Sequence, residues 1–191
     1  MLLPIVGYGN NILREKCMDI NKDYPNLDKL IADMWETLYA SNGVGLAAPQ
    51  IDRNIRVFVV DSAQIFEHSE PGDREFPDKP GFKKVFINAH IVDKKGEEWP
   101  YQEGCLSIPG IREDILRPEE VAIEYVDENF QPHTDTFHGI TARIIQHEYD
   151  HIDGKLFIDY LKPLKRKLLA RKFDNIVKGN VNVDYRMKFA K

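Results

Sequence analysis

The sequence has 191 residues, of which 42% are hydrophobic and 30% are charged. This balance is typical of a soluble globular chain with one hydrophobic core. The net charge of −5 and the isoelectric point near 5.7 argue against a protein whose whole surface binds nucleic acid, so we expect no specific DNA binding. No apolar run approaches the roughly 18 residues of a membrane-spanning helix, so no membrane association is expected.

The sequence contains only two cysteines, Cys17 and Cys105. Two cysteines do not make a disulfide framework, and free thiols are typical of a reducing compartment. The N-terminal residues 1–7 are apolar, but they are too few for the hydrophobic region of a signal peptide and no basic segment precedes them. We therefore expect a cytoplasmic protein.

The first half of the chain predicts one long helix and one buried strand. Apolar residues at helical spacing predict a helix over 27–41, with Asn26 as its N-cap and Asn42-Gly43 as its end. Residues 56–60 are predicted to form the strand. Residues 62–83 are rich in proline and glycine and are predicted to be a surface insertion, either a cover for a substrate cleft or a passive loop.

The second half predicts more strands and two helices. We expect strands at 85–95, 98–102, 121–126 and 131–137, a turn at Gly96, a short extended segment at 156–158, and helices at 139–152 and 162–178. Residues 179–191 are expected to be a flexible tail. The predicted fold class is α+β, a single domain over 1–178 in which antiparallel strands pack around the central helix 139–152, with a C-terminal helix outside.

The central predicted helix carries a metal-hydrolase pattern. His147 and His151 lie four residues apart, so both imidazoles leave the same helix face. Glu148 completes H-E-x-x-H, in which two histidines bind a cation and the glutamate acts as general base. The histidines share an apolar stripe with Ile140 and Ile144. Two buried histidines beside a buried glutamate would be unfavourable without a cation, so we prefer this interpretation to packed or solvated histidines.

Cys105 is the candidate for a third ligand. A free cysteine is often only a small buried hydrophobic residue, but a Cys-His-His set leaves an open position for water, as in catalytic metal sites. This ligand set suits Zn²⁺, and Fe²⁺ or other borderline divalent cations are also compatible. Glu148 could take a proton from water at the open position.

Three segments together resemble the signature motifs of one enzyme family. Gly43–Gln50, Glu103–Gly110 and Gln146–Gly154 are similar, in the family's order, to the three motifs of peptide deformylases, and the resemblance extends from Ile5 to about Leu164. The chain looks like the bacterial type I branch. The resemblance implies a hydrolase that removes the formyl group from formyl-methionyl nascent peptides and releases formate.

The resemblance also implies a role for individual residues. Cys105, His147 and His151 would bind the metal, which is Fe²⁺ in the family, with Zn²⁺ or Ni²⁺ possible. Glu148 would be the general base and then the general acid. The Gln50 side chain and the Leu106 N–H would stabilise the oxyanion, each lowering the barrier by roughly 3 kcal/mol.

Substrate binding is predicted in less detail. By resemblance, the backbone of Gly43, Val44 and Gly45 would pair with the substrate as an added strand, although these residues could simply form a turn. Candidates for the methionine pocket are Val44, Tyr101, Ile140 and Ile144, each of which could equally be a core residue. Glu103 and Asp150 could orient a ligand histidine or form structural salt bridges, and Arg143 could edge the pocket or face solvent.

The predicted helix 162–178 is strongly basic. In type I relatives a C-terminal helix is linked to ribosome docking, and a basic helix suits rRNA phosphates, but a solvated helix face is also consistent with this composition. Two other functions remain open at this point. H-E-x-x-H alone suggests a general zinc peptidase, although His151 is the last histidine and such enzymes usually take a downstream third ligand. A non-catalytic module with Cys17 as a fourth ligand is favoured by nothing in the sequence.

Overall fold

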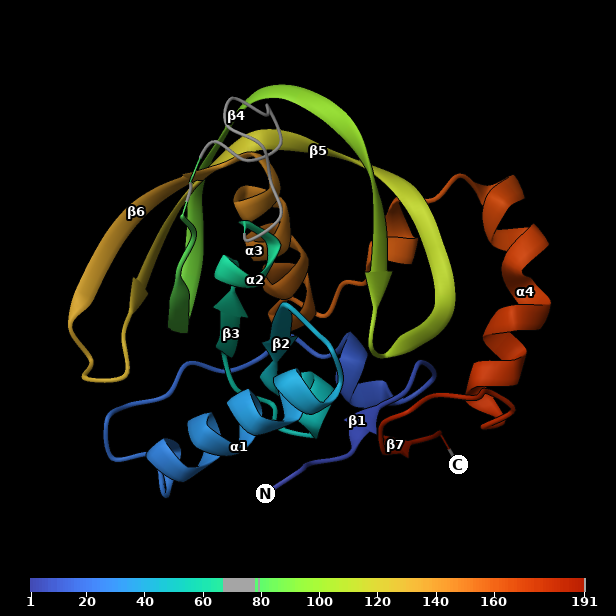
Figure 1. The fold of residues 1–191 in the computed structure, drawn as a ribbon, viewed down its shortest axis with the longest axis horizontal. Helices are drawn as coiled ribbons and strands as arrows, with labels where there is room; N and C mark the ends of the chain where they lie inside the picture. The colour runs from blue at the N-terminus through green and yellow to red at the C-terminus, as the bar shows by residue number, and fades with distance from the viewer. Residues whose placement is uncertain (67–77, 79, 191) are drawn as a thin grey trace.

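In the computed structural model, which describes residues 1–66, 78 and 80–190, antiparallel strands surround one central helix, α3 (Gly139–Ile152) (Figure 1). The five-stranded sheet has the order β2-β3-β4-β5-β6, and each neighbouring pair is antiparallel. Its strands are β2 (Gly45–Ala47), β3 (Val57–Asp61), β4 (Lys83–Cys105), β5 (Ile108–Val126) and β6 (Pro132–His138). The predicted α+β class is confirmed.

The remaining elements lie around this sheet. They are β1 (Ile5–Val6), η1 (Asn11–Arg14), α1 (Leu27–Ala40), η2 (Ala48–Ile51), α2 (Ala63–Phe66), η3 (Phe157–Tyr160), α4 (Pro163–Val177) and β7 (Met187–Lys188). Most of the predicted insertion 62–83 lies outside the described residues. Among the described residues, no helix has the length and apolar content that crossing a membrane requires.

Helix α1 confirms the first predicted helix: it begins at Leu27 as predicted and ends at Ala40, one residue earlier than predicted. Its apolar stripe, including Ile31 and Met34, is buried. The helical spacing of apolar residues therefore predicted the helix correctly. Asn26 adopts a left-handed conformation with φ of 57° and makes no side-chain cap. At the other end Asn42, not the glycine after it, has the positive φ of 54°, because an asparagine tolerates this conformation better than most residues.

The β4–β5 hairpin is the largest departure from the predicted elements. The turn predicted at Gly96 is wrong, since the strand continues through it from Lys83 to Cys105. Gly96 has a φ of 82° at a register shift, which is the geometry of a bulge that bends a strand without ending it. The bent hairpin arches over α3 (Figure 1). Its real turn lies between Cys105 and Ile108, which pair with each other.

Helix α3 has the predicted bounds, and nearly every residue in it is buried. It contacts β2, β3, β5 and β6, so it lies inside the arch (Figure 1). More than half of its residues are nevertheless polar or charged, and buried polar residues must find partners within the protein. The position of α3 therefore brings His147, Glu148 and His151 to the inner surface of the sheet.

The C-terminal part differs from the prediction in two ways. The segment predicted to be extended at 156–158 begins the 3₁₀ helix η3, while α4 confirms the third predicted helix. The segment after Gly179 was predicted to be a flexible tail. It contains β7, which pairs in parallel with β1. The first and last described segments therefore lie side by side (Figure 1).

Candidate metal centre and catalytic cleft

Three potential ligands converge between the β4–β5 turn and α3. Cys105 is the last residue of β4, and His147 and His151 lie one turn apart on α3. Their ligand atoms all lie within 4.8 Å of one another, and Cys105 Sγ is 3.2 Å from His151 Nε2. Metal–sulfur and metal–nitrogen bonds of about 2.3 and 2.0–2.1 Å allow one cation to reach all three. The donor set and its spacing therefore fit a single divalent ion.

Glu103 orients one of these histidines. Its Oε2 lies 2.9 Å from His147 Nδ1, so Nε2 is the ring nitrogen left to face Cys105 and His151. Although burial alone raises the pKa of Glu103, hydrogen bonds to His147 and Arg117 lower that pKa well below its usual value. The carboxylate is therefore charged. Of the two interpretations of Glu103, this contact supports the orienting one.

Two buried arginines balance the charge of Glu103. Arg117 donates to both of its oxygens, at 2.6 and 3.0 Å, and also donates to Asp150 Oδ2 at 2.7 Å. Arg143 donates to Glu103 Oε1 at 2.7 Å and is only 2% exposed. Arg143 therefore does not face solvent, and Asp150 contacts an arginine instead of a ligand histidine.

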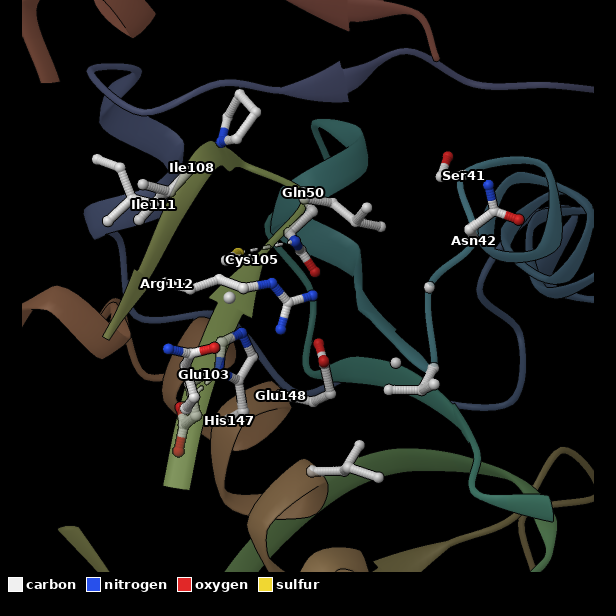
Figure 2. Close-up of a pocket in the computed structure, with 18 of the residues that line it drawn as sticks. Ser41, Asn42, Gln50, Glu103, Cys105, Ile108, Ile111, Arg112, His147 and Glu148 are labelled. Carbon is white, nitrogen blue, oxygen red and sulfur yellow. Dashed lines mark hydrogen bonds and ion pairs between the residues drawn. The ribbon is translucent and has the colours of Figure 1, made fainter. Parts of the chain in front are cut away.

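Glu148 is a buried carboxyl group at the edge of the same cavity. It is 4% exposed, and its Oε2 has no hydrogen-bond partner among the described residues. Burial raises the pKa of Glu148 to about 7, which suits a group that takes up and gives back a proton near neutral pH. Figure 2 shows its carboxylate directed into the space beside Cys105 and Gln50.

Gly45 makes room for Glu148. A Cβ built on Gly45 would lie 2.7 Å from the Glu148 Cδ and 2.8 Å from its Cγ, which is closer than real Cβ atoms approach other atoms. The glycine in the first motif therefore allows strand β2 to pass directly over the carboxyl group. This close approach explains why the motif needs a residue without a side chain at this position.

Gln50 presents an oriented amide to the cavity. Its Oε1 accepts the Ala47 N–H at 2.9 Å, and its Nε2 donates to Ser107 Oγ at 3.2 Å and lies 3.5 Å from Cys105 Sγ. Because the oxygen is committed to a backbone donor, the NH₂ group must face Cys105. Leu106 follows Cys105 in the β4–β5 turn, so its backbone N–H lies next to Cys105.

A cleft of about 830 Å³ joins these groups. Apart from His151, every residue proposed above for catalysis, metal binding or substrate binding lines it, including Gly43, Val44, Gly45, Tyr101, Ile140 and Ile144. Strand β2 borders the cleft and is an edge strand, because it pairs only with β3 among the described strands. The cleft thus combines polar groups, an apolar wall and a free strand edge.

Sequence reasoning missed several residues that line this cleft. Arg112 extends into the cavity (Figure 2), and it pairs across the hairpin with Gly104, next to Cys105. A regular hairpin closed at Cys105 and Ile108 would not predict this pairing, because a register shift between Gly104 and Cys105 leaves extra residues on β5 before Arg112. Val183, Asp184 and Tyr185 also line the cleft, and their local sequence contains no signal for this position.

Comparison with known proteins decides the family. A model of the family described as "Polypeptide deformylase" matches residues 2–167. The chain belongs to the peptide deformylase family. A peptide deformylase of Christiangramia forsetii is 50% identical over 189 residues, covering 99% of this chain and 96% of the relative. One of Flavobacterium johnsoniae is 51% identical over 190 residues, covering 100% of this chain and 97% of the relative.

Solved structures agree with this assignment. The crystal structure of peptide deformylase from Ehrlichia chaffeensis matches with a TM-score of 0.81 and 33% identity, covering 94% of this chain and 99% of that one. As a peptide deformylase, the protein is a metal-dependent hydrolase that removes the N-formyl group from nascent peptides.

Family membership excludes the general zinc peptidase considered above. The non-catalytic module also loses its fourth ligand, because Cys17 is buried in a different apolar cluster from the one that Cys105 packs against. In the part of the chain that the structure describes, Cys17 belongs to no group of potential metal ligands.

Proposed function

We propose that Cys105, His147 and His151 bind one divalent cation, and that Glu148 transfers the proton during removal of the formyl group. The observation that carries this proposal is the buried Oε2 of Glu148, which has no hydrogen-bond partner among the described residues and lines the same cleft as Cys105 and His147, two of the three converging ligands. When bound, the ion supplies Lewis acidity, which lowers the pKa of water and polarises a carbonyl group.

The residues of the chain then complete the reaction. Glu148 accepts a proton from the attacking water, and the new C–O bond converts the formyl carbonyl into a tetrahedral alkoxide. Gln50 Nε2 and the Leu106 N–H donate to that oxygen. Glu148 passes its proton to the departing nitrogen as the C–N bond breaks. Cleavage of the C–N bond releases formic acid and the N-terminal amine and returns Glu148 to its carboxylate form. Formic acid then gives its proton to the amine, so the products are formate and an N-terminal ammonium group, and atoms and charge balance.

We propose that the peptide lies along the free edge of β2, with the backbone of Gly43, Val44 and Gly45 as its partner. The methionine side chain would enter the apolar part of the cleft. Ile140 and Ile144 lie one turn apart on α3 and line the cleft together with Val44 and Tyr101. Their apolar surfaces suit an unbranched thioether side chain.

The identity of the cation belongs to the same proposal. One thiolate and two imidazoles suit Fe²⁺ as well as Zn²⁺ or Ni²⁺, and we propose Fe²⁺ as the physiological ion. Anaerobic metal analysis of the purified protein tests this, together with activity followed in air. The Fe²⁺ form is expected to lose activity in aerated buffer, whereas equal stability of the Fe²⁺ and Ni²⁺ forms would contradict ferrous chemistry.

We further propose that α4 docks on the ribosome. Its lysines and arginines are exposed, while Leu169, Phe173 and Ile176 anchor it to the protein. An exposed basic helix would meet rRNA phosphates favourably. Co-sedimentation with ribosomes should weaken as salt rises and should be reduced when Lys165, Arg166 and Lys167 are replaced by glutamine.

We also propose where in the cell the protein acts and which residues form its domain. The substrate is made in the cytoplasm and both cysteines are free, which supports a cytoplasmic protein. The acidic net charge supports the absence of specific DNA binding. We propose that the deformylase domain comprises residues 1–178 together with the segment after Gly179, because β7 pairs with β1 and Tyr185 lines the cleft.

The decisive experiment measures formate release from a formyl-methionyl peptide. The variant Glu148→Gln keeps the size of the side chain but cannot accept the proton, so turnover should fall by about 10²–10⁴-fold. Its metal content, measured by atomic emission, should equal that of the wild type. Turnover within a few fold of the wild type at full metal content would refute the role of Glu148.

A further inference from the structure

The turn that carries Leu106 is held by the C-terminal segment of the chain. Tyr185 donates its hydroxyl hydrogen to the Leu106 carbonyl oxygen at 2.8 Å. The two residues before it, Val183 and Asp184, line the cleft together with Tyr185. A residue close to the end of the chain therefore contacts the backbone next to a proposed oxyanion donor.

The same turn is held from a second side. The Tyr8 N–H donates to the Ser107 carbonyl oxygen at 2.8 Å. Leu106 and Ser107 are the two residues between the paired Cys105 and Ile108, so both carbonyl groups of this two-residue turn accept a hydrogen bond from outside the hairpin. Two independent donors restrict the rotation of both peptide planes more strongly than a single donor does.

These two donors belong to segments that pair with each other. β1 and β7 form a parallel ladder, and the flanking bonds run from the Ile5 N–H to the Arg186 oxygen at 2.8 Å and from the Gly7 N–H to the Lys188 oxygen at 2.9 Å. Tyr8 lies two residues after the end of β1, and Tyr185 lies two residues before the start of β7. The ladder therefore fixes the distance between the two groups that hold the turn.

The C-terminal segment is itself well packed. Residues 181, 183, 185, 187 and 189 are partly buried, while 182, 184, 186 and 188 are exposed, which is the alternation of an extended chain with one inward face. Asn10 donates through its side chain to the Lys188 carbonyl oxygen at 3.2 Å. Lys188 also forms an ion pair with Asp52. These contacts of Lys188 hold β7 in place, and Tyr185 lies two residues before β7.

We propose that Tyr185 is a positioning residue for the Leu106 N–H, supplied to the active site by the C-terminal segment. This inference rests on the proposed role of Leu106 as an oxyanion donor. The peptide planes on either side of Leu106 share its Cα, so a hydrogen bond to its carbonyl limits the orientations open to its N–H. Oxyanion donors stabilise the transition state only if they are aimed before the reaction begins.

The test compares Tyr185→Phe with the wild type, both loaded with Zn²⁺. Phenylalanine keeps the ring and removes only the hydroxyl group. We expect kcat to fall about 5-fold, less than the roughly 10²-fold effect of deleting an oxyanion donor outright. KM should stay within about 2-fold, because a contact that matters in the transition state acts on kcat. Hydrogen exchange at the Leu106 amide, followed by NMR, should become about 5-fold faster.

The matched control is Tyr125→Phe. The Tyr125 hydroxyl donates to Asp135 Oδ2 at 2.7 Å on the β5–β6 hairpin, and it does not line the cleft. This variant loses that hydrogen bond and also the one that the hydroxyl accepts from Lys84 at 3.1 Å. It therefore disturbs the hydrogen bonding of the protein at least as much as Tyr185→Phe does, and its melting temperature reports the structural effect alone. Its kcat and the exchange rate of the Leu106 amide should match those of the wild type.

Three results would overturn the inference in different ways. Unchanged exchange at Leu106 in Tyr185→Phe would mean that the hydroxyl does not hold the turn. Faster exchange with unchanged kcat would mean that the turn is held but that the Leu106 N–H is not a donor in the transition state, which would also refute that part of the proposed function. A rise in KM at constant kcat would assign Tyr185 to substrate binding and contradict positioning.

Discussion

Replacing Arg117 with methionine tests whether the buried ion pairs behind the metal site hold the fold together. Arg117 is 2% exposed and connects Glu103 to Asp150. In Arg117→Met, Asp150 keeps only the hydroxyl of Tyr160, at 3.1 Å, as a side-chain partner among the described residues. The substitution thus leaves a buried carboxylate without a counter-charge.

The expected loss of stability is large. Removing one partner of a buried ion pair destabilises a protein by about 3–5 kcal/mol, and in a domain of this size 1 kcal/mol lowers the melting temperature by about 2–4 °C. Arg117→Met should therefore melt about 6–20 °C below the wild type. Methionine fills much of the same volume, so the loss reports charge more than packing.

Thermal unfolding of the metal-loaded proteins, followed by circular dichroism, measures this effect. The control is Lys165→Met, which removes a surface ion pair of 2.9 Å with Glu113 from a lysine side chain that is 47% exposed. An exposed pair contributes at most about 1 kcal/mol, so this variant should melt within about 4 °C of the wild type. Equal melting temperatures for the two variants would refute the argument.

Three further predictions concern the cleft. In Gly45→Ala the new methyl group collides with the Glu148 carboxyl group, so formate release should fall at least about 10-fold; unchanged kcat would show that the strand moves freely. Burial raises the pKa of Cys17 to about 12, so iodoacetamide at pH 7.5 should label only Cys105, and labelling should accelerate after chelation of the metal. Labelling of Cys17 in the folded protein, read by peptide mass spectrometry, would contradict this. A formyl-alanyl peptide forgoes about 1.5–3 kcal/mol of methionine burial, so its kcat/KM should be about 10- to 150-fold lower, and equal values for the two peptides would remove the apolar pocket from the proposal.

The residues closest to the proposed chemistry could be predicted from the sequence, because the patterns that identify them are local. His147, Glu148 and His151 lie within one helical turn, so helix geometry alone puts them together. The bounds of α3 were also predicted correctly, because Ile140 and Ile144 share a helix face with the two histidines and Asp153-Gly154 marks the end of the helix. Gln50 and Cys105 lie within short motifs, and their resemblance to a family linked segments far apart in the chain.

The shape of the sheet could not be predicted in the same way. Gly96 was predicted to be a turn residue. The residues before and after it in the sequence both pair with β5, so Gly96 forms a bulge within one continuous strand. A positive φ is available to glycine in either setting, so only the partner strand decides between them. The place of Arg112 in the cleft depends on another irregularity, the register shift between Gly104 and Cys105, which likewise appears only when the two strands are paired.

The candidate metal ligands, the proposed proton-transfer group and the family could all be predicted from the sequence, because each depends on residue types at fixed short spacing. How that candidate site is supported depends on the tertiary structure. Arg117 and Arg143 neutralise Glu103 from positions 14 and 40 residues away, and Tyr185 reaches Leu106 across 79 residues. Such contacts arise from the packing of distant segments, which no local pattern of residues encodes.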